Sequence, residues 1–342
     1  MKRITILLLG IGLETLILTD YEVEKLLSLS EVVEAVESAF KQKGLGRVQM
    51  PAKIYLYYKK YGGDLRAMPT FLEDLDISAV KIVNVHPRNP NENGLPTVMA
   101  VIILIDPSTG APIAIMGGTT ITDLRTGAAG GVAAKYLARR DSKVVGLVGA
   151  GAQARTQLMA LLELFNLEEV RVWSRTEETK KKFATEIQQV HGNKFQVNPV
   201  TSIEMAVIGA DIVVTTTPSR KPLIMTDMVS AGMHINCIGA DAVGKEELDP
   251  NIFKRAKIVV DDWAQASHSG EINVPLSSGI ITKDDVWAEI GEIVAGSKAG
   301  RERPEEITIF TSTGLAVQDA VTAQIAYRKA ITSKVGRFLR II

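Results

Sequence analysis

The sequence predicts an α/β protein with two domains: a doubly wound parallel sheet, and a mixed α+β domain whose sheet is mostly antiparallel. The chain has 342 residues, more than a single hydrophobic core usually holds. Its first part alternates β-rich runs with turns containing Gly, Pro and Asn. From Lys143 onward, apolar β-branched runs alternate with helical segments, which is typical of βαβ units.

Residues 1–13 join a charged start to a short apolar run that glycine interrupts. The pattern resembles the front of a signal peptide, but no small-residue cleavage pattern follows it. The run is also too short to cross a bilayer, which takes about 20 apolar residues. We interpret it as an N-terminal extension before a first strand at 15–19.

A helix is expected at 28–44, because its apolar residues recur at helical spacing and Gly44 can end it. Turn-rich segments such as HPRNPNENGLP and DPSTGAP then separate the next candidate strands. These are residues 53–58, 77–85, 97–105 and 111–116, followed by a helix at 122–137.

The parallel sheet is expected to use six strands with helices between them. A later strand at 308–311 and the helix after Gly314 are expected to return to the first domain. We therefore predict a substrate-binding and dimerisation domain at 13–127 and 310–342, and a dinucleotide-binding domain at 128–309. The six strands are 144–148, 170–173, 195–200, 212–215, 234–238 and 258–260.

Charge and cysteine content exclude several classes of protein. Lysine plus arginine equals aspartate plus glutamate, 39 against 39, so no net charge attracts nucleic acid or an anionic membrane. We expect neither as a partner. The single cysteine, Cys237, excludes an intrachain disulfide and fits a reducing cytoplasm, and we expect it to be a buried strand residue.

The segment Gly149-Ala-Gly-Ala-Gln-Ala154 lies between a predicted strand and a predicted helix. The first glycine permits the tight turn, the second lets the backbone approach a pyrophosphate, and Ala154 allows close packing of helix and strand. The helix N-terminus then presents unpaired N–H groups to the phosphates. This context predicts a Rossmann domain that binds a dinucleotide.

The end of the second parallel strand normally carries an acidic residue for the adenosine ribose. Here the chain has Ser174 at that place, followed by Arg175 and Thr176. Arg175 could pair with a 2′-phosphate, with the two hydroxyls as further donors, or it could be a solvated surface residue. The cofactor is therefore expected to be NAD or NADP, with a slight preference for NADP.

Other loops at the carboxyl ends of the strands are rich in hydroxyl groups, at 215–219 and 311–314. Ligands of open α/β sheets bind at that edge, although any one hydroxyl could equally serve its own turn. The predicted cofactor contacts are Thr126, Gly149, Gly151, Ala152, Gln153, Ser174, Arg175, Thr176, Thr215, Thr216, Thr217, Ile238, Gly239 and Ser312.

An ordered set of motifs, from about Leu13 to the C-terminal region, resembles the ornithine cyclodeaminase and mu-crystallin family, and within it the archaeal alanine dehydrogenase branch. The resemblance implies a homodimer, an α-amino acid or its imine as substrate between the domains, and no metal. The motifs are MPAK, DLRAMP, KIVNVHPRN, GLPTVMA, LRTGAAGGVAAKYLAR, GAGAQA, TTTPSRKP, HINCIGAD, GKEELD, GEINVP and STGLAVQD.

The resemblance also implies the roles of five charged residues. Arg125 matches the arginine that binds the substrate carboxylate, for which a planar guanidinium is suited. Lys81 matches the active-site lysine, which could hold the carboxylate or carry a proton if desolvation lowers its pKa. Asp241 matches the carboxylate that handles the amine or the attacking water, as a general base would. Lys53 and Arg66 match residues associated with catalysis and substrate binding in the alanine dehydrogenase branch.

Position 66 bears on the choice of substrate. Ornithine cyclodeaminases have a stretch similar to ELMP there, whereas this chain has LRAMP. An arginine would repel the side-chain ammonium of ornithine by roughly 4 kcal/mol at about 4 Å and an effective dielectric of about 20.

The leading hypothesis is therefore NAD(P)-dependent, reversible oxidative deamination of L-alanine to pyruvate and ammonia. Ornithine cyclodeamination, reduction of a cyclic imine such as pyrroline-2-carboxylate, and non-enzymatic dinucleotide and small-acid binding like that of mu-crystallins are the alternatives. Three histidines attract attention but have other expected roles: His86 lies past a strand end, where we expect it to stabilise a turn, and His234 and His268 lack neighbours at metal-ligand spacing.

Overall fold

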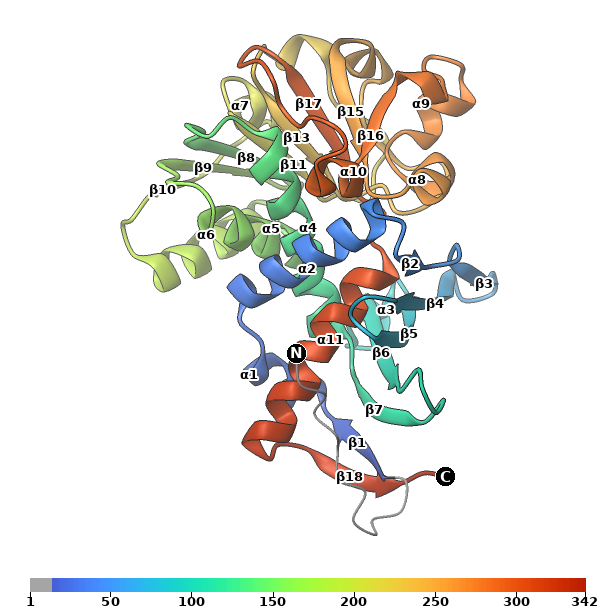
Figure 1. Ribbon diagram of the computed structural model, residues 1–342. Helices are drawn as coiled ribbons and strands as arrows, with labels where there is room; N and C mark the ends of the chain where they lie inside the picture. Colours follow the sequence, from blue (N-terminus) through green and yellow to red (C-terminus); the bar gives the residue numbers. More distant parts are fainter. Residues whose placement is uncertain (1–13) are drawn as a thin grey trace.

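The computed structural model describes residues 14–342, so the interpretation of residues 1–13 lies outside the described part. Two eight-stranded sheets are joined through a layer of helices (Figure 1). The predicted α/β class is confirmed. No helix within residues 14–342 is long and apolar enough to cross a membrane.

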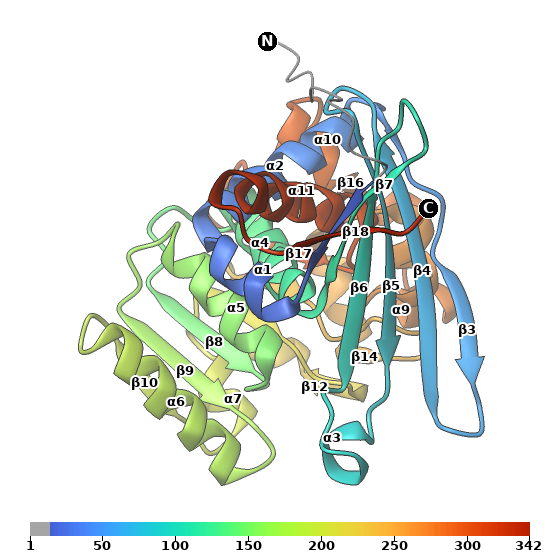
Figure 2. The ribbon, with the colours of Figure 1, turned by 90° about the horizontal axis from the view of Figure 1, so that it is seen from below.

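The first sheet has the strand order β18-β1-β7-β6-β5-β4-β2, with β3 paired to β4. Neighbouring strands of this sheet are antiparallel, except that β1 and β7 are parallel. Figure 2 shows the long strands β4, β5 and β6 side by side. The strands are β1 (Glu14–Leu18), β2 (Val48–Gln49), β3 (Ile54–Tyr58), β4 (Gly63–Leu72), β5 (Ile77–Val85), β6 (Val98–Ile105), β7 (Pro112–Gly117) and β18 (Arg337–Arg340).

Helices cover one face of this sheet and fill the space toward the second one. The C-terminal helix α11 packs on β4, β5 and β6, and α2 packs between α4, α10 and α11. Fully buried side chains such as Phe40, Ile102 and Leu137 form this core. The helices are α1 (Asp20–Leu26), α2 (Leu29–Gly44), α3 (Asn89–Glu92), α4 (Thr119–Leu137) and α11 (Ala316–Ser333).

The second sheet is parallel throughout, in the order β10-β9-β8-β11-β13-β17-β15-β16. A small parallel pair, β12 (Arg220–Ile224) with β14 (Glu246–Leu248), lies outside it. The strands are β8 (Val144–Val148), β9 (Glu169–Trp173), β10 (Gln196–Pro199), β11 (Ile212–Thr215), β13 (His234–Cys237), β15 (Ala256–Val260), β16 (Val286–Glu289) and β17 (Ile307–Thr311).

The remaining helices belong to the connections of this parallel sheet. They are α5 (Ala152–Leu162), α6 (Glu177–His191), α7 (Ile203–Val207), α8 (Trp263–Ser269), α9 (Asn273–Ser277) and α10 (Ile290–Ala295), with short 3₁₀ turns η1 (Thr226–Met228), η2 (Pro250–Arg255) and η3 (Lys283–Asp285).

One expected element has a different place. The strand predicted at 308–311 was expected to return to the first domain, but β17 lies between β13 and β15 in the parallel sheet. Ile309 and Phe310 in its centre are fully buried, so the strand completes the core of this sheet. The chain returns to the first sheet only after β17, with α11 and β18. The proposed division at 309/310 therefore falls inside β17.

Strand order reverses between β8 and β11. From β8 the chain adds β9 and β10 on one side, and then crosses to the other side of β8 to form β11. Open α/β sheets bind ligands at such a point, outside the carboxyl ends of the strands. Helix α4 approaches the same region, because its small residues let it pack closely: a Cβ on Gly127 would lie 2.4 Å from the Thr156 carbonyl oxygen. This packing places residues of α4 between the two sheets.

Candidate active site

The turn after β8 has the features that a bound pyrophosphate requires. Gly149 has a φ of +115°, and a Cβ there would lie 2.3 Å from Thr216 Oγ1. Helix α5 begins after Gly151 with no side-chain cap, and a Cβ built at Gly151 meets nothing within 4 Å. Uncapped N–H groups facing open space suit a phosphate. The residues present fit a dinucleotide.

Polar atoms around the switch point support that fit. The hydroxyls of Thr215, Thr216 and Ser312 and the Oε1 atom of Gln153 are buried without a hydrogen-bond partner among the described residues. Such atoms in a folded protein usually have a partner, and a ligand can provide one. The hydroxyl of Thr126, by contrast, donates to the Thr122 carbonyl at 2.6 Å.

Two further predicted cofactor contacts have their backbone N–H groups engaged within the protein. The N–H groups of Thr217 and Gly239 donate to the carboxylate of Glu247, at 2.6 and 3.0 Å. At the end of β9, Ser174 is half-buried and Arg175 is exposed. Ala152 opens α5, Ile238 is buried after β13, and the Thr176 hydroxyl caps α6 by accepting from the Thr179 N–H at 3.4 Å.

Lys81 and Arg125 meet at one buried carboxylate, Asp319. Lys81 Nζ, on β5, lies 2.7 and 2.6 Å from the two oxygens of Asp319, on α11. Arg125 Nε, on α4, lies 2.9 Å from Asp319 Oδ1, close enough for an ion pair although not aligned as a hydrogen bond. Arg125 Nη1 donates to Gln318 Oε1 at 2.8 Å. These contacts leave Nη2 as the group through which Arg125 can meet a ligand.

Burial dominates the electrostatics of Lys81. Its side chain is inaccessible to solvent. Desolvation and the nearby charge of Arg125 lower the pKa of Lys81, Asp319 opposes them, and the result is a pKa of about 7. Lys81 is therefore a group that can exchange a proton near neutral pH.

Arg66 and Asp241 join the two domains. Arg66, on β4, donates to both oxygens of Asp64 at 2.9 and 3.1 Å, and through Nη1 to Asp241 Oδ2 at 3.0 Å. Lys245 Nζ lies 2.5 Å from the other oxygen of Asp241. Burial alone would raise the pKa of Asp241, but Arg66 and Lys245 outweigh it and lower the pKa to about 2. Arg66 thus faces the interior between the domains.

These pairings change the argument about position 66. Asp64 and Asp241 both contact the guanidinium of Arg66, so they offset much of its charge. The expected repulsion of several kcal/mol between Arg66 and a cationic substrate holds only if Arg66 is unpaired. The charge of Arg66 alone therefore does not discriminate against ornithine.

Lys53 occupies the space between these clusters. Its ammonium donates to the Thr313 carbonyl at 2.5 Å. Burial lowers the pKa of Lys53 to about 8, with Asp261 opposing and Arg66 and Arg125 contributing. Asp261 in turn accepts from the backbone N–H groups of Thr313 and Gly314, at 2.6 and 2.9 Å. The structure thus brings all five predicted charged residues into one neighbourhood.

Sequence reasoning predicted Asp241 but missed Asp64 and Asp319, which also pair with these cations. Asp64 lies two residues before Arg66 in one strand, a spacing that puts both side chains on the same face. Gln318 and Asp319 lie in the STGLAVQD motif, and a carboxylate near the predicted Arg125 could have been sought there. The glycine of the same motif is also needed: a Cβ on Gly314 would lie 2.3 Å from Arg125 Nη1.

The histidines have structural contacts. His86 stacks on Tyr58 with ring centroids 5.8 Å apart. His234 contacts Thr308 and Asn236, both at 2.9 Å, and burial lowers its pKa to about 3. Within residues 14–342, no group of three histidine, cysteine, aspartate or glutamate residues could hold a metal ion.

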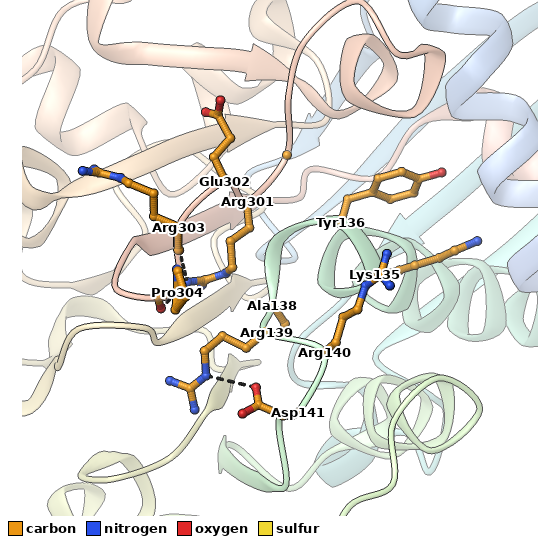
Figure 3. A pocket seen from close by; sticks show the side chains of 11 residues that line it. Lys135, Tyr136, Ala138, Arg139, Arg140, Asp141, Arg301, Glu302, Arg303 and Pro304 are labelled. Atoms are coloured by element: carbon orange, nitrogen blue, oxygen red, sulfur yellow. Dashed lines mark hydrogen bonds and ion pairs between the residues drawn. The ribbon is translucent and has the colours of Figure 1, made fainter.

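A separate cavity of about 500 Å³ lies at the amino edge of the parallel strands, away from these clusters (Figure 3). Most of its cations are already paired: Arg139 with Asp141 and Asp211, Lys135 with Glu37, and Arg303 with Glu305 and Glu306. Arg301 donates to the Leu137 carbonyl at the end of α4. These contacts explain the basic lining as a structural feature, and we assign this cavity no ligand.

Known proteins are similar to this chain in sequence and in fold. An alanine dehydrogenase of Archaeoglobus fulgidus is 52% identical over 332 residues, which cover 96% of this chain and 100% of that protein. An archaeal alanine dehydrogenase dimer with bound NAD has a TM-score of 0.92 at 51% identity, covering 96% of this chain and 100% of that one. The Delta(1)-pyrroline-2-carboxylate reductase of Thermococcus litoralis, in complex with NADH and L-proline, has a TM-score of 0.90 at 42% identity, covering 94% and 99%. Residues 13–334 match the model of the Ornithine cyclodeaminase/mu-crystallin family, and the chain belongs to that family, as its motifs predict.

Proposed function

We propose that the protein is an NAD(H)-dependent alanine dehydrogenase, which oxidises L-alanine to pyruvate and ammonia and catalyses the reverse reaction. The observation that carries the proposal is the buried meeting of Lys81 and Arg125 at Asp319, beside a dinucleotide-fitting edge. The Archaeoglobus fulgidus relative, at 52% identity, supports alanine as the substrate.

Arg125 is proposed to bind the substrate carboxylate through Nη2, because its other guanidinium nitrogens contact Asp319 and Gln318. Gly314 lies against the guanidinium and leaves room for it, because a Cβ there would lie 2.3 Å from Nη1. The bound nicotinamide supplies the hydride acceptor for Cα of alanine. Holding Cα in place against it is the main contribution asked of Arg125.

Lys81 is proposed to exchange the proton, because its pKa of about 7 suits a general base near neutral pH. The family resemblance implied that role for Asp241 or a lysine. The carboxylate of Asp241 contacts both Arg66 and Lys245 and its pKa is about 2, so it is a weak base. We assign Asp241 the electrostatic task of holding the substrate amino group or the attacking water, with Lys53 as a second proton carrier.

A homodimer is proposed from the open face of the first sheet. Ile54, Ala67, Ile82 and Val101 lie opposite one another on neighbouring strands and so share a face. Three of them are exposed although apolar: Ile54 at 60%, Ile82 at 36% and Val101 at 45%. A second copy of the chain can cover this row, and the similar archaeal alanine dehydrogenase is a dimer.

NAD is the proposed cofactor, since the similar archaeal dehydrogenase and the reductase hold NAD and NADH. The slight preference for NADP rested on Ser174 and Arg175, and NADP remains the alternative. A cytoplasmic location is proposed from the single cysteine.

Reduction of Δ1-pyrroline-2-carboxylate is the second candidate function, because the Thermococcus litoralis reductase is 42% identical. The purified protein should be given pyruvate, ammonium and NADH or NADPH, and separately Δ1-pyrroline-2-carboxylate with NADH. Faster NADH loss with pyruvate and ammonium supports the proposal. Loss only with the cyclic imine would replace it by the reductase.

Two further outcomes separate the remaining alternatives. Ornithine with a trace of NAD should give no proline, and proline formation without net cofactor change would identify a cyclodeaminase. Tight dinucleotide binding with no turnover of any of these substrates would identify a binding protein.

A further inference from the structure

Two carboxyl groups in the parallel-sheet domain are almost inaccessible to solvent and belong to none of the clusters above. Glu247 lies on β14 and Glu271 lies between α8 and α9, with exposures of 0% and 1%. Within residues 14–342, neither forms an ion pair with a lysine, arginine or histidine. Buried carboxyl groups without a cation are costly, so their hydrogen bonds must account for their presence.

Glu247 bridges two loops with its two oxygens. Oε1 accepts from the Thr217 N–H at 2.6 Å, and Oε2 accepts from the Gly239 N–H at 3.0 Å. Thr217 follows β11 and Gly239 follows β13, and these strands are neighbours in the parallel sheet. One carboxylate therefore sets the separation of two adjacent loops at the carboxyl edge.

The segment of Glu271 holds the strand of Glu247 in place. Glu271 Oε1 accepts from the N–H groups of Glu247 and Leu248, at 2.6 and 2.7 Å. Asn273, two residues later, accepts from the Gly244 N–H at 2.9 Å and donates to the Lys245 carbonyl at 3.0 Å. Chain 244–248 is thereby fixed from one side, while Glu247 fixes the loops on the other.

The two carboxyl groups differ in what they need. Burial raises the pKa of Glu247 to about 7, and the backbone N–H groups from which both of its oxygens accept hydrogen bonds oppose this rise by favouring the charged form. Burial raises the pKa of Glu271 well above its usual value, with Glu247 adding to the rise, and only one of its oxygens accepts hydrogen bonds. A glutamine can reproduce the single acceptor of Glu271. At position 247, by contrast, the NH₂ group of a glutamine would face a backbone N–H, and two donors cannot form a hydrogen bond.

The loops that Glu247 holds lie at the reacting end of the proposed cofactor site. Asp241, two residues after Gly239, contacts Arg66 of the other domain. The pyrophosphate-fitting turn at Gly149–Gly151 lies after β8 and has no contact with Glu247 in the described hydrogen bonds. Gly149 of that turn packs against Thr216, the neighbour of Thr217, so the pyrophosphate half would depend on Glu247 only through this contact and less than the nicotinamide half.

We infer that Glu247 is a positioning residue for the nicotinamide half of the dinucleotide site, and that Glu271 and Asn273 support it. The inference rests on the proposed function for the presence of the cofactor. It concerns residues for which neither the motif resemblance nor the substrate assignment supplies a role.

Glu247→Gln, Glu271→Gln and the control Glu246→Gln test it in the full-length protein. Glu246 is the neighbouring, half-buried glutamate on the same strand. Binding of NADH and of ADP-ribose, which lacks nicotinamide, is measured by calorimetry. Glu247→Gln should weaken NADH binding by about tenfold, about 1.4 kcal/mol, and change ADP-ribose binding by less than about twofold. Glu246→Gln should change neither, and Glu271→Gln should change NADH binding by less than about threefold.

Unchanged NADH binding by Glu247→Gln would overturn the inference, and so would equal losses for NADH and ADP-ribose. If Glu247→Gln does not fold, Asn273→Ala provides the test, with NADH binding weakened by about threefold and ADP-ribose binding kept. Failure of the proposed function is separate: wild-type protein that binds NADH but does not oxidise alanine would reject the dehydrogenase while leaving this comparison intact.

Discussion

Replacing Asp319 with asparagine removes the negative charge that Lys81 and Arg125 share. Two unit charges about 4 Å apart attract by roughly 4 kcal/mol at an effective dielectric of about 20, which corresponds to about three pKa units. Asp319 contacts both cations at once and asparagine keeps a dipole, so we expect a smaller change at Lys81. A fall of about one unit or more in the pKa of Lys81 is the working prediction.

The sign follows from the charge. Asp319 raises the pKa of Lys81 against burial, so its removal makes the neutral amine persist to lower pH. If neutral Lys81 accepts the proton during alanine oxidation, wild-type kcat/KM falls as the pH drops below about 7. In Asp319→Asn the fall should move toward acid by about one unit or more, and KM for alanine should rise because Arg125 loses a partner.

Initial rates of NADH formation from L-alanine and NAD, measured across the pH range for both proteins, give these curves. Thr122→Val is a matched control, because the Thr122 hydroxyl lies 3.5 Å from Lys81 Nζ and carries no charge. In Thr122→Val the fall of kcat/KM at acid pH, the acid limb of the curve, should stay where it is in the wild type. An acid limb that does not move in Asp319→Asn would refute the assignment of the proton to Lys81.

Three further predictions address other parts of the site. Gly314→Ala should raise KM for alanine at least tenfold with NADH affinity unchanged, because its Cβ would meet Arg125 Nη1 at 2.3 Å and its φ is +78°; an unaltered KM would contradict the placement of Arg125. Asp241→Asn should abolish turnover and keep NADH affinity. Because the pKa of Asp241 is lowered to about 2, its charged form should contribute about 2 kcal/mol to the free energy of unfolding above about pH 4. This contribution should be lost as the pH falls through about 2. Equal unfolding free energies of variant and wild type at neutral pH would exclude it. Arg175→Ala should leave NAD affinity unchanged, and a loss confined to NADP would restore the alternative cofactor.

Much of the fold follows from sequence periodicity. The strands predicted at 77–85, 144–148 and 212–215 have the same bounds in the structure, because their runs of apolar β-branched residues end at clear turns. Strand β4 was missed. Its alternation of buried positions includes Arg66, and Pro69 interrupts it, so a charged residue and a proline conceal the pattern that its neighbours display.

The site was predictable as a set of cations and a phosphate-binding turn, but not as pairs. Asp319 lies in the first turn of a helix, where an acidic residue is common on the surface for electrostatic reasons. Glu247 and Glu271 are of a type that is rarely buried. Their roles depend on contacts between segments far apart in the chain, which local patterns do not record. The place of β17 within the parallel sheet depends on such contacts as well.

The transfer of hydrogen from Cα of alanine to the cofactor is the central claim, and isotope labelling tests it most directly. L-Alanine deuterated at Cα is incubated with the protein and NAD, and the reduced cofactor is analysed by mass spectrometry. The proposed chemistry predicts one deuterium in each NADH formed, and pyruvate that carries no deuterium. Reduced cofactor without deuterium would contradict it. So would a failure of alanine to reduce NAD with protein that turns over Δ1-pyrroline-2-carboxylate and NADH in a separate mixture.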